Sequence, residues 1–489
     1  MKRIAYPYPA ASRRMQVMCA TLLVLELILS GGPAKASRQP NYGGTLRVQM
    51  RERISTIDPR QWPSDSRRAD ALERLGSLVF DRLVRFDKHG VVQPALAVSW
   101  QHDAQSKRWQ FLMRTDVKFS DGAPLTPGVA ALALQQLLGN AFDVRATFDS
   151  VVIQTDHSQP DFPMLIALGR YFIFRVADDG SLAGTGPFRV AAWDVAEGSA
   201  KAVFVANESC WAGRPFVDKI ELTMGVNFEQ QANAIAFGQA DVVELPASQV
   251  RRASQRGVRT VSSDPVELFA LQFDTARPAV RDMRVRQAIS LALDRSSISD
   301  VILQRQGVVA GGLLPNWLSG YEFLFPAAED LPRAKELLTA TGREVSHPAP
   351  LVLIYDSGDA DARAVAERVA VNLREAGMVT HISEQSAVMK TSSADMRLVR
   401  HRIWSPDPGV ALTELLNVLG ESPAGLDTPE QAYAAERAPI DAFRVIPLVH
   451  LSESYGLGPQ VRDWMPPRWG GWRLDDLWLE SASAGGTSP

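Results

Sequence analysis

The stretch PALAVSWQHDAQSKRWQFLMRTDVKFSDGAP, residues 94–124, carries the clearest local pattern in this chain. Trp109, Phe111 and Met113 alternate with the intervening positions, which is the period of two that a half-buried strand shows. Residues 120–122, Ser-Asp-Gly, close the segment with residue types that favour a turn. On this pattern alone, the stretch is predicted to be a strand in a β-rich core.

The composition of the 489-residue chain is that of an ordinary globular protein: 46% hydrophobic, 22% charged, with a formal net charge of −3. The length suffices for about two or three core-forming units. Because there is no basic excess, no nucleic-acid partner is expected. The chain has 11 Trp, and such rings line ligand clefts as well as cores.

Residues 1–36 have the composition of a secretory signal peptide. Lys2 and Arg3 begin it, an apolar run covers residues 17–29, and Ala-Lys-Ala at 34–36 has the small residues that precede a cleavage site. The alternative is a membrane anchor, but a run of about 13 residues is shorter than the ~20 needed to span a bilayer. We therefore expect export, cleavage after about Ala36 and a periplasmic location.

The chain contains two cysteines, Cys19 and Cys210. Cys19 lies inside the apolar run, so cleavage would leave Cys210 with no partner for an internal disulfide. No His lies near Cys210 in the sequence. It is therefore predicted to be a half-buried structural residue rather than a nucleophile.

Regular periodicity is strong in the second half of the chain. Apolar residues recur at helical spacing over residues 285–293, and Asp282 is placed to cap this helix. Residues 351–355 predict a buried strand, and residues 365–376 predict a helix. With a further strand from near Val379, these segments form an α/β unit.

The stretch at 94–124 also resembles the signature of the family 5 solute-binding proteins of ABC importers, the dipeptide- and oligopeptide-binding group. That family has Pro-x-Leu-Ala-x-x-Trp, then Trp-x-Phe-x-Leu-Arg, then Phe-x-Asp-Gly-x-Pro-Leu-Thr, and the same order occurs here. Met113 stands where the family usually has Leu, and Ser120 where His is common. By this resemblance the chain is identified as a member of the family.

Four more segments resemble landmarks of the same family: residues 184–188, 207–215, 284–295 and 398–408. Residues 184–188, Gly-Thr-Gly-Pro-Phe, are expected to form a tight turn before a strand, because the third glycine of a dinucleotide-binding loop is missing. Arg286, in the third segment, is expected to be a surface or capping residue.

The resemblance implies an α/β, two-lobed periplasmic-binding-protein fold of type II, cluster C-like, with a hinge between the lobes. The large lobe is expected to comprise residues 37–266, with residues 444–480 returning to it. The second lobe is expected to comprise residues 267–443. Residues 481–489 contain only small and turn-forming types after the last Glu-Ser pair and are expected to be a disordered tail.

The resemblance also points to candidate ligand-binding residues. The counterpart of Asp407 pairs with the α-ammonium group of a bound peptide, a charge-assisted contact that selects for a cation. The alternative is that Asp407 only forms a rigid turn in Ser-Pro-Asp-Pro. Trp404 is expected to wall the pocket or to pack in a core, and Tyr355 and Arg402 are candidates by position. A peptide carboxylate would want an Arg partner, which the sequence does not single out.

No local motif supports catalysis or a resident metal. The seven His form no His-x-x-x-His pair, and both Gly-x-Ser-x-Gly and Cys-x-x-Cys are missing. We therefore expect no enzyme activity, no cofactor and no metal site, although nickel-binding relatives exist.

The expected function is extracytoplasmic capture of a small ligand, foremost a short peptide, by a monomer that delivers it to the permease of an ABC transporter. One alternative is a ligand-sensing protein of the same fold. The other is a degenerate relative that no longer transports, since Cys210 replaces the family's Tyr and the segment after the helix predicted at 128–138 is short.

Overall fold

The computed structural model describes residues 40–196, 199–321, 323–341, 350–385, 394–421, 426 and 428–480. The predicted signal peptide and the predicted tail at 481–489 lie outside these ranges. Residues from Asn41 onward form one compact unit. None of the helices in the described ranges is long and apolar enough to cross a membrane.

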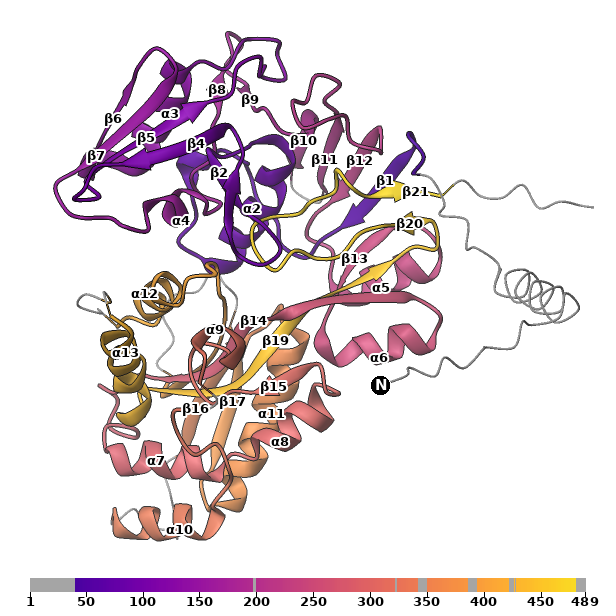
Figure 1. The fold of residues 1–489 in the computed structure, drawn as a ribbon. Coiled ribbons are helices and arrows are strands. Elements are labelled where there is room, and N and C mark those ends of the chain that lie inside the picture. Colours follow the sequence, from indigo (N-terminus) through magenta and orange to yellow (C-terminus); the bar gives the residue numbers. More distant parts are fainter. Residues whose placement is uncertain are drawn as a thin grey trace, which may run out of the picture. The chain divides into compact units, whose positions relative to one another are not determined.

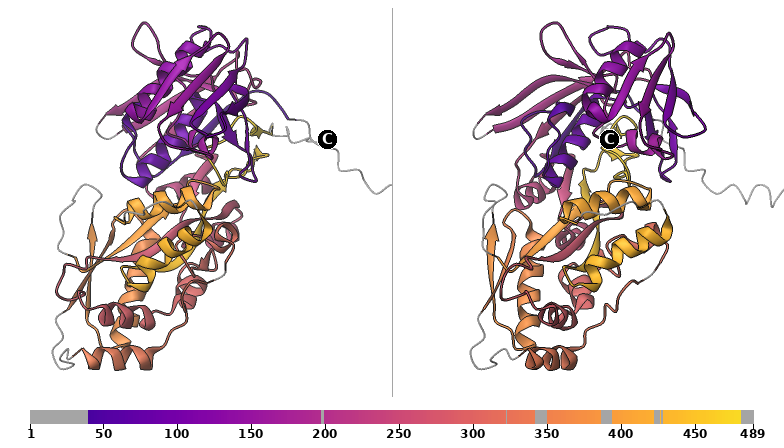
Figure 2. Two further views of the ribbon diagram at one scale, coloured as in Figure 1. Left: turned by 60° about the vertical axis from the view of Figure 1, so that its left-hand side comes forward. Right: turned by 90° about the vertical axis from the view of Figure 1, so that its left-hand side faces the viewer.

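One mixed sheet runs through the whole of this unit (Figure 1). In spatial order its described strands are β10 (Phe188–Ala196), β11 (Ser199–Ala206), β12 (Lys219–Thr223), β1 (Thr45–Gln49), β13 (Val242–Leu245), β19 (Val445–Leu457), β14 (Arg259–Phe273), β18 (Met396–Arg402), β16 (Leu351–Asp356) and β17 (Thr380–Gln385), with β15 (Gly307–Val309) beside β19. The end with β10, β11, β12 and β1 belongs to one hydrophobic core, and we call this part the first lobe. The end with β18, β16 and β17 belongs to another core, and we call that part the second lobe. Figure 2 shows the same two lobes from two further directions.

The long antiparallel strands β14 and β19 join the lobes. Their pairing extends from Arg259 opposite Leu457 to Gln272 opposite Val445. The register shifts on both sides of Pro265, where the missing N–H interrupts the ladder. β14 ends at Phe273, and β19 begins at Val445.

The strand predicted from the signature stretch is confirmed as β5 (Arg108–Met113). Trp109, Phe111 and Met113 point into the core of the first lobe, whereas Arg108 and Leu112 are exposed. The strand lies in a smaller antiparallel sheet with β4 (Ala97–His102), β7 (Ser150–Thr155) and β6 (Phe142–Ala146). The remaining described strands form short hairpins: β2 (Val84–Phe86) with β3 (Val92–Pro94), β8 (Arg175–Val176) with β9 (Leu182–Ala183), and β20 (Val461–Arg462) with β21 (Trp478–Leu479).

Side-chain caps set the starts of several helices. Asp282 accepts a hydrogen bond from the Arg284 N–H and starts α7 (Met283–Ala292), as predicted. Asp65 accepts a hydrogen bond from the Arg68 N–H and starts α2 (Ser66–Val79). The other described helices are α3 (Pro127–Leu138), α4 (Phe162–Ile166), α5 (Phe228–Ala236), α6 (Ala247–Gln255), α8 (Arg295–Ser297), α9 (Asn316–Ser319), α10 (Leu331–Ala340), α11 (Ala360–Glu375), α12 (Pro408–Val418) and α13 (Pro429–Asp441), with the short helices η1 (Pro59–Gln61), η2 (Gly139–Ala141) and η3 (Ile298–Ile302).

The C-terminal segment completes the core of the first lobe. Tyr455, Trp464 and Trp472 pack with residues of β1 and α2, and the yellow strands β20 and β21 lie beside that lobe in Figure 1. The core of the second lobe contains residues from α7, β16 and α11. Because β14 and β19 pass from one core into the other, the exact lobe boundaries at residues 266 and 443 stay a prediction.

Arg286 lies in a different environment from the one expected. It is buried, and its guanidinium donates hydrogen bonds to the carbonyl oxygens of Val280, Arg281, Ala442 and Phe443. The expectation of a surface residue was wrong, whereas a capping role agrees with its hydrogen bonds to the carbonyls of Ala442 and Phe443, where α13 ends. The side chain fastens α7 to the chain that leads into β19, a contact between segments far apart in the sequence.

The Gly-Thr-Gly-Pro-Phe segment, residues 184–188, packs against the C-terminal end of α2. The Gly186 N–H donates to the Val79 carbonyl at 2.9 Å, and the Gly184 carbonyl accepts from the Ser120 N–H at 2.8 Å. A Cβ atom at Gly184 would overlap the Val79 carbonyl oxygen. Gly184 is therefore required by close approach of two backbones.

We expect Gly184→Ala to lower the free energy of unfolding by about 1–3 kcal/mol, because backbone atoms cannot move aside cheaply. Gly128→Ala is the matched control, since its Cβ would meet no atom closer than the Thr126 Oγ1 at 3.8 Å. The control should be neutral or stabilising by up to about 1 kcal/mol. Urea unfolding of both variants checks this, and equal stabilities would contradict it.

The burial of His450, on β19, leads us to predict that the stability of the fold depends on pH. Its Nε2 lies 3.0 Å from the Leu313 carbonyl, and burial lowers the pKa of the ring to about 4 from the ordinary 6.5. Above pH 6.5 both folded and unfolded states are neutral at this site. As the pH falls from 6.5 toward 4, only the unfolded chain takes up the proton, so stability falls by on the order of 3 kcal/mol from this residue.

We expect His450→Gln, which keeps an N–H donor, to flatten the fall in unfolding free energy between pH 6.5 and 4.5. Urea unfolding at several pH values measures this slope. Parallel curves for the variant and the parent protein would contradict the assignment.

Candidate functional site

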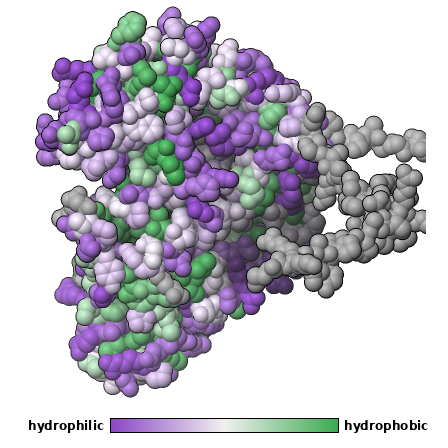
Figure 3. All heavy atoms as spheres, in the orientation of Figure 1, coloured by the Kyte–Doolittle hydropathy of each residue, from purple (hydrophilic) through white to green (hydrophobic). Residues whose placement is uncertain are grey.

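A cleft of about 1140 Å³ lies between the two lobes. The first lobe lines it with residues of the segments 62–69, ahead of and within α2, and 158–170, around α4. The second lobe lines it with residues of the segments 404–418 and 426–432, at α12 and α13. Figure 1 shows α4 facing α12, and Figure 3 shows the surface hollowed at this level. The volume is comparable with the ~300–1,000 Å³ of pockets that take small ligands.

Four ionisable side chains of opposite sign line this cleft. Asp161 and Arg170 come from the first lobe, and Asp407 and Glu414 from the second. The Arg170 Nη2 lies 2.8 Å from the Glu414 Oε1, so one ion pair already bridges the lobes. Burial raises the pKa of Glu414, and Arg170 partly offsets that effect.

Asp407 is held at the edge of the cleft by the start of α12. Its Oδ1 accepts a hydrogen bond from the Val410 N–H at 2.8 Å, and Pro408 occupies the first turn. The residue therefore caps a helix, a third role beside the turn and the ligand contact weighed from the sequence. The cap uses one carboxylate oxygen and leaves the residue on the cleft wall.

Trp404 combines both roles weighed for it. It lines the cleft and also packs against the core of the first lobe. The Arg402 guanidinium lies 5.6 Å from the centre of its ring. Trp62, on the first-lobe side, lines the same cleft, so an aromatic ring is available from each lobe.

The other two candidates lie elsewhere. Tyr355 is on β16 with 8% of its surface exposed, inside the core of the second lobe and not among the residues that line the cleft. Arg402 is buried behind the cleft, in the charge network described next. Asp407 and Trp404 therefore both line the cleft, whereas Tyr355 and Arg402 do not, although Arg402 contacts the Trp404 ring from behind.

Sequence reasoning missed Asp161, Arg170, Glu414 and Trp62. Asp161 and Arg170 flank a five-residue helix with no pattern that marks a site. Glu414 is one charged residue in an apolar helix. Only the fold brings these residues together, because they lie far from Asp407 in the sequence.

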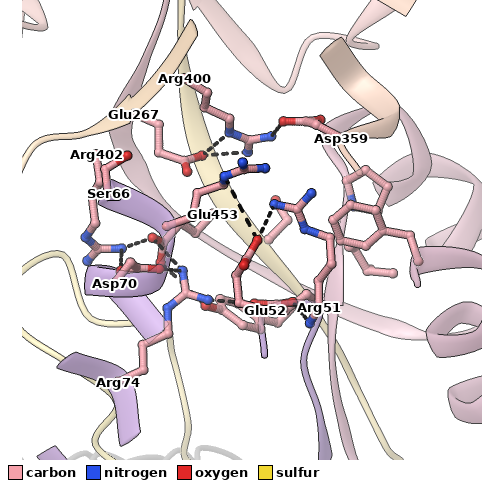
Figure 4. Close-up of a pocket in the computed structure, with 17 residues that line it drawn as sticks. Arg51, Glu52, Ser66, Asp70, Arg74, Glu267, Asp359, Arg400, Arg402 and Glu453 are labelled. Atoms are coloured by element: carbon pink, nitrogen blue, oxygen red, sulfur yellow. Dashed lines mark hydrogen bonds and ion pairs between the residues drawn. The ribbon is translucent and has the colours of Figure 1, made fainter. Parts of the chain in front are cut away.

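A dense charge network lies next to the cleft, around a small cavity of about 90 Å³ (Figure 4). Ser66 lines both spaces. We define the network by its guanidinium and carboxylate groups: Arg51, Arg67, Arg74, Arg400 and Arg402 with Glu52, Asp70, Glu244, Glu267, Asp356, Asp359, Asp361 and Glu453. The cavity is too small for a peptide.

Glu453, on β19, is the centre of this network. Arg74 from α2 of the first lobe approaches it at 3.0 Å, and Arg402 from β18 of the second lobe forms an ion pair with it. Arg402 also lies 3.4 Å from Asp70, on α2. One buried carboxylate thus holds cations from both lobes.

Arg400, also on β18, is a single guanidinium that pairs with several carboxylates, among them Glu267 of β14. It lies 2.6 Å from Glu267 and 3.2 Å from Asp359. Burial opposes the charge on Arg400, but Glu267 and the two aspartates raise the pKa of its guanidinium well above the ordinary value. Burial would raise the pKa of Asp359, and the Arg400 and Arg51 guanidinium groups lower it below its usual range.

Asp361 adds a link that uses no cation. Its carboxylate oxygens accept from the N–H groups of Ala247 and Ser248 at 2.9 and 3.1 Å, where α6 begins. Burial and then the neighbouring Asp359 raise the pKa of Asp361. Arg51 and Arg67 of the first lobe both contact Asp356 of the second. These contacts fix the lobes relative to each other in the observed state.

The described residues offer little metal or nucleophile chemistry. Within the described ranges, no group of three or more His, Cys, Asp or Glu is placed to hold a metal ion. Burial raises the pKa of the Cys210 thiol to about 11, which disfavours the reactive thiolate. His401 is neutral at physiological pH, since burial lowers its pKa to about 4.

Removing one cation from the network should be costly. We expect Arg402→Met to lower the free energy of unfolding by about 3–5 kcal/mol, because Glu453 and Asp70 stay buried with less compensation. Arg363→Met is the control, since Arg363 and Glu367 form an exposed pair on α11. Urea unfolding should show no measurable loss in the control, and an equally small loss in Arg402→Met would contradict a structural role.

Comparisons with known proteins agree on one family. The family model described as "Bacterial extracellular solute-binding proteins, family 5 Middle" matches residues 91–422, more than half of the chain. The nickel-binding periplasmic protein of Escherichia coli K12 is 29% identical over 415 residues, 75% of this chain and 77% of that protein.

Two solved structures share the fold. The oligopeptide-binding protein AppA of Bacillus subtilis, in complex with a nonapeptide, aligns with a TM-score of 0.77 at 15% identity. NikA of Brucella suis, in complex with Fe(III)-EDTA, aligns with a TM-score of 0.77 at 19% identity. The alignments cover 90% and 89% of this chain and 100% of each solved chain. The chain therefore belongs to the family 5 extracellular solute-binding proteins of ABC importers, with their two-lobed α/β fold.

Proposed function

We propose that this protein captures a short peptide in the interlobe cleft and delivers it to the permease of an ABC transporter. Members of the family bind small solutes and work with such permeases, and they are binding proteins rather than enzymes. The observation that carries the choice of ligand is the pair Arg170 and Asp407, which offers one charge of each sign on opposite walls of the cleft. A peptide with free ends carries the two complementary charges.

Asp407 receives the ligand's α-ammonium group. Its Oδ1 is occupied by the Val410 N–H, which leaves the second oxygen for a charge-assisted hydrogen bond. Arg170 receives the ligand's carboxylate through its planar donor fork. Since Arg170 is paired with Glu414 in the observed state, a ligand carboxylate competes with Glu414 or shares the guanidinium with it.

Closure couples capture to delivery. The contacts come from both lobes, so a bound peptide favours the closed arrangement by as much as it binds that arrangement better than the open one. The two paired strands β14 and β19 are the connection about which the lobes move. The protein acts as a monomer in the periplasm after export and cleavage near Ala36; the similar nickel-binding protein of Escherichia coli K12 is a periplasmic protein by its name.

Isothermal titration calorimetry of the processed protein with di- to pentapeptides tests this proposal. We expect Asp407→Asn and Arg170→Gln each to weaken binding by about 10- to 100-fold, the loss expected for one charge-assisted hydrogen bond. The surface substitutions Asp143→Asn and Arg145→Gln are matched controls, because these residues pair with each other on exposed β6.

Modified ligands assign each contact. N-acetylation of the peptide should weaken its binding to the parent protein by as much as Asp407→Asn weakens binding of the free peptide. It should not weaken binding to the Asp407→Asn variant any further. C-terminal amidation should behave in the same way with Arg170→Gln. If the losses of affinity from the modified ligand and from the substitution simply add, the assigned contact is wrong. If the protein binds a nickel–histidine complex tightly and binds no peptide, the proposal of a peptide ligand is wrong.

A further inference from the structure

The charges that line the cleft do not balance. Three carboxylates, Asp161, Asp407 and Glu414, face a single guanidinium, Arg170. Arg170 already neutralises Glu414 across the cleft. Within the described residues, Asp161 and Asp407 therefore have no cation of their own. An amphoteric peptide with one ammonium group would neutralise only one of them.

Asp161 is a solvent-exposed carboxylate on the wall of the cleft. It precedes α4, but its side chain makes no capping hydrogen bond there. It lines the first-lobe wall of the cleft, whereas Asp407 lines the second-lobe wall. Burial and then the charge on Asp407 raise the pKa of Asp161.

Two like charges on opposite lobes resist closure of an empty cleft. Closing removes water from both carboxylates and increases their repulsion in a medium of lower dielectric constant. A cation between them reverses both effects. The cleft also has a ring from each lobe, Trp62 and Trp404, whose faces favour a nearby cation.

We infer that the preferred solute is a basic short peptide, with an N-terminal ammonium at Asp407 and a Lys or Arg side chain at Asp161. This inference rests on the proposed function and narrows it. The second cation occupies the space between the lobes, where it neutralises the carboxylate that a neutral peptide leaves uncompensated. Basic peptides are therefore favoured over neutral and acidic peptides of the same length.

The ratio of dissociation constants tests this preference. Calorimetry with the processed protein should compare Ala-Ala-Ala, Ala-Lys-Ala, Lys-Ala-Ala and Ala-Glu-Ala at two salt concentrations. We expect at least one Lys peptide to bind 10-fold or more tightly than Ala-Ala-Ala, and the Glu peptide to bind more weakly. The preference should shrink at high salt, since the contact is electrostatic.

Asp161→Asn should bring the ratio between the Lys and the Ala peptide close to one. Asp178→Asn is the matched control, because Asp178 is an exposed carboxylate on the same lobe. It should keep the parent ratio. The melting temperatures of both variants establish that they are folded.

The outcomes separate the inference from the function on which it rests. Equal affinity for Lys and Ala peptides, or a preference that survives Asp161→Asn, overturns the inference and leaves peptide capture standing. Failure of every peptide, together with binding of a nickel–histidine complex, overturns both.

Discussion

Glu453 imposes the constraint on which the arrangement of the lobes depends. It has 7% of its surface exposed and lies on β19, one of the two strands that connect the lobes. A buried carboxylate without a cation costs several kcal/mol, so the fold must bring guanidinium groups to it. Arg74 arrives from α2 and Arg402 from β18, which means that both lobes must meet at this point. The cleft exists because two lobes are held together along one edge.

The same constraint positions the cleft wall. Arg402 ends β18 with its side chain directed at Glu453, and the chain then passes through Trp404 to Asp407 and α12. Because the position of Arg402 is fixed, the start of the loop that leads through Trp404 to Asp407 in the cleft wall is fixed as well. Arg402 is not a lining residue, but it determines where the lining residues begin.

Local patterns predicted the elements of this fold well. The alternation of Trp109, Phe111 and Met113 gave a strand because one face of β5 is buried, and Asp282 gave a helix start because caps act within one turn. Gly184 marked a real close approach of backbones. The family signature supplied the lobes, which no local pattern contains. Arg286 was misjudged because its four carbonyl partners come from two segments, one of them more than a hundred and fifty residues away.

The site was less predictable for the same reason. Asp407 and Trp404 follow one another in a motif, so a resemblance could locate both. Asp161 and Arg170 meet them only when the lobes pack, since they lie more than two hundred residues earlier in the chain, as the separation of 244 residues between Arg170 and Glu414 shows. Tyr355 was chosen by position in a strand, and a strand with period two sends half of its side chains into the core.

The network around Glu453 and the charges that line the cleft differ in how they are compensated. Every carboxylate of the network around Glu453 has a guanidinium or N–H partner, including Asp361, which accepts from the start of α6. The carboxylates of this network are compensated by the chain itself, without a ligand. The cleft is the reverse: it has room for a solute, and two of its carboxylates have no cation in the described chain. Charge that the protein itself compensates requires no ligand, whereas charge left uncompensated beside an open volume is the feature on which our proposal for the ligand rests.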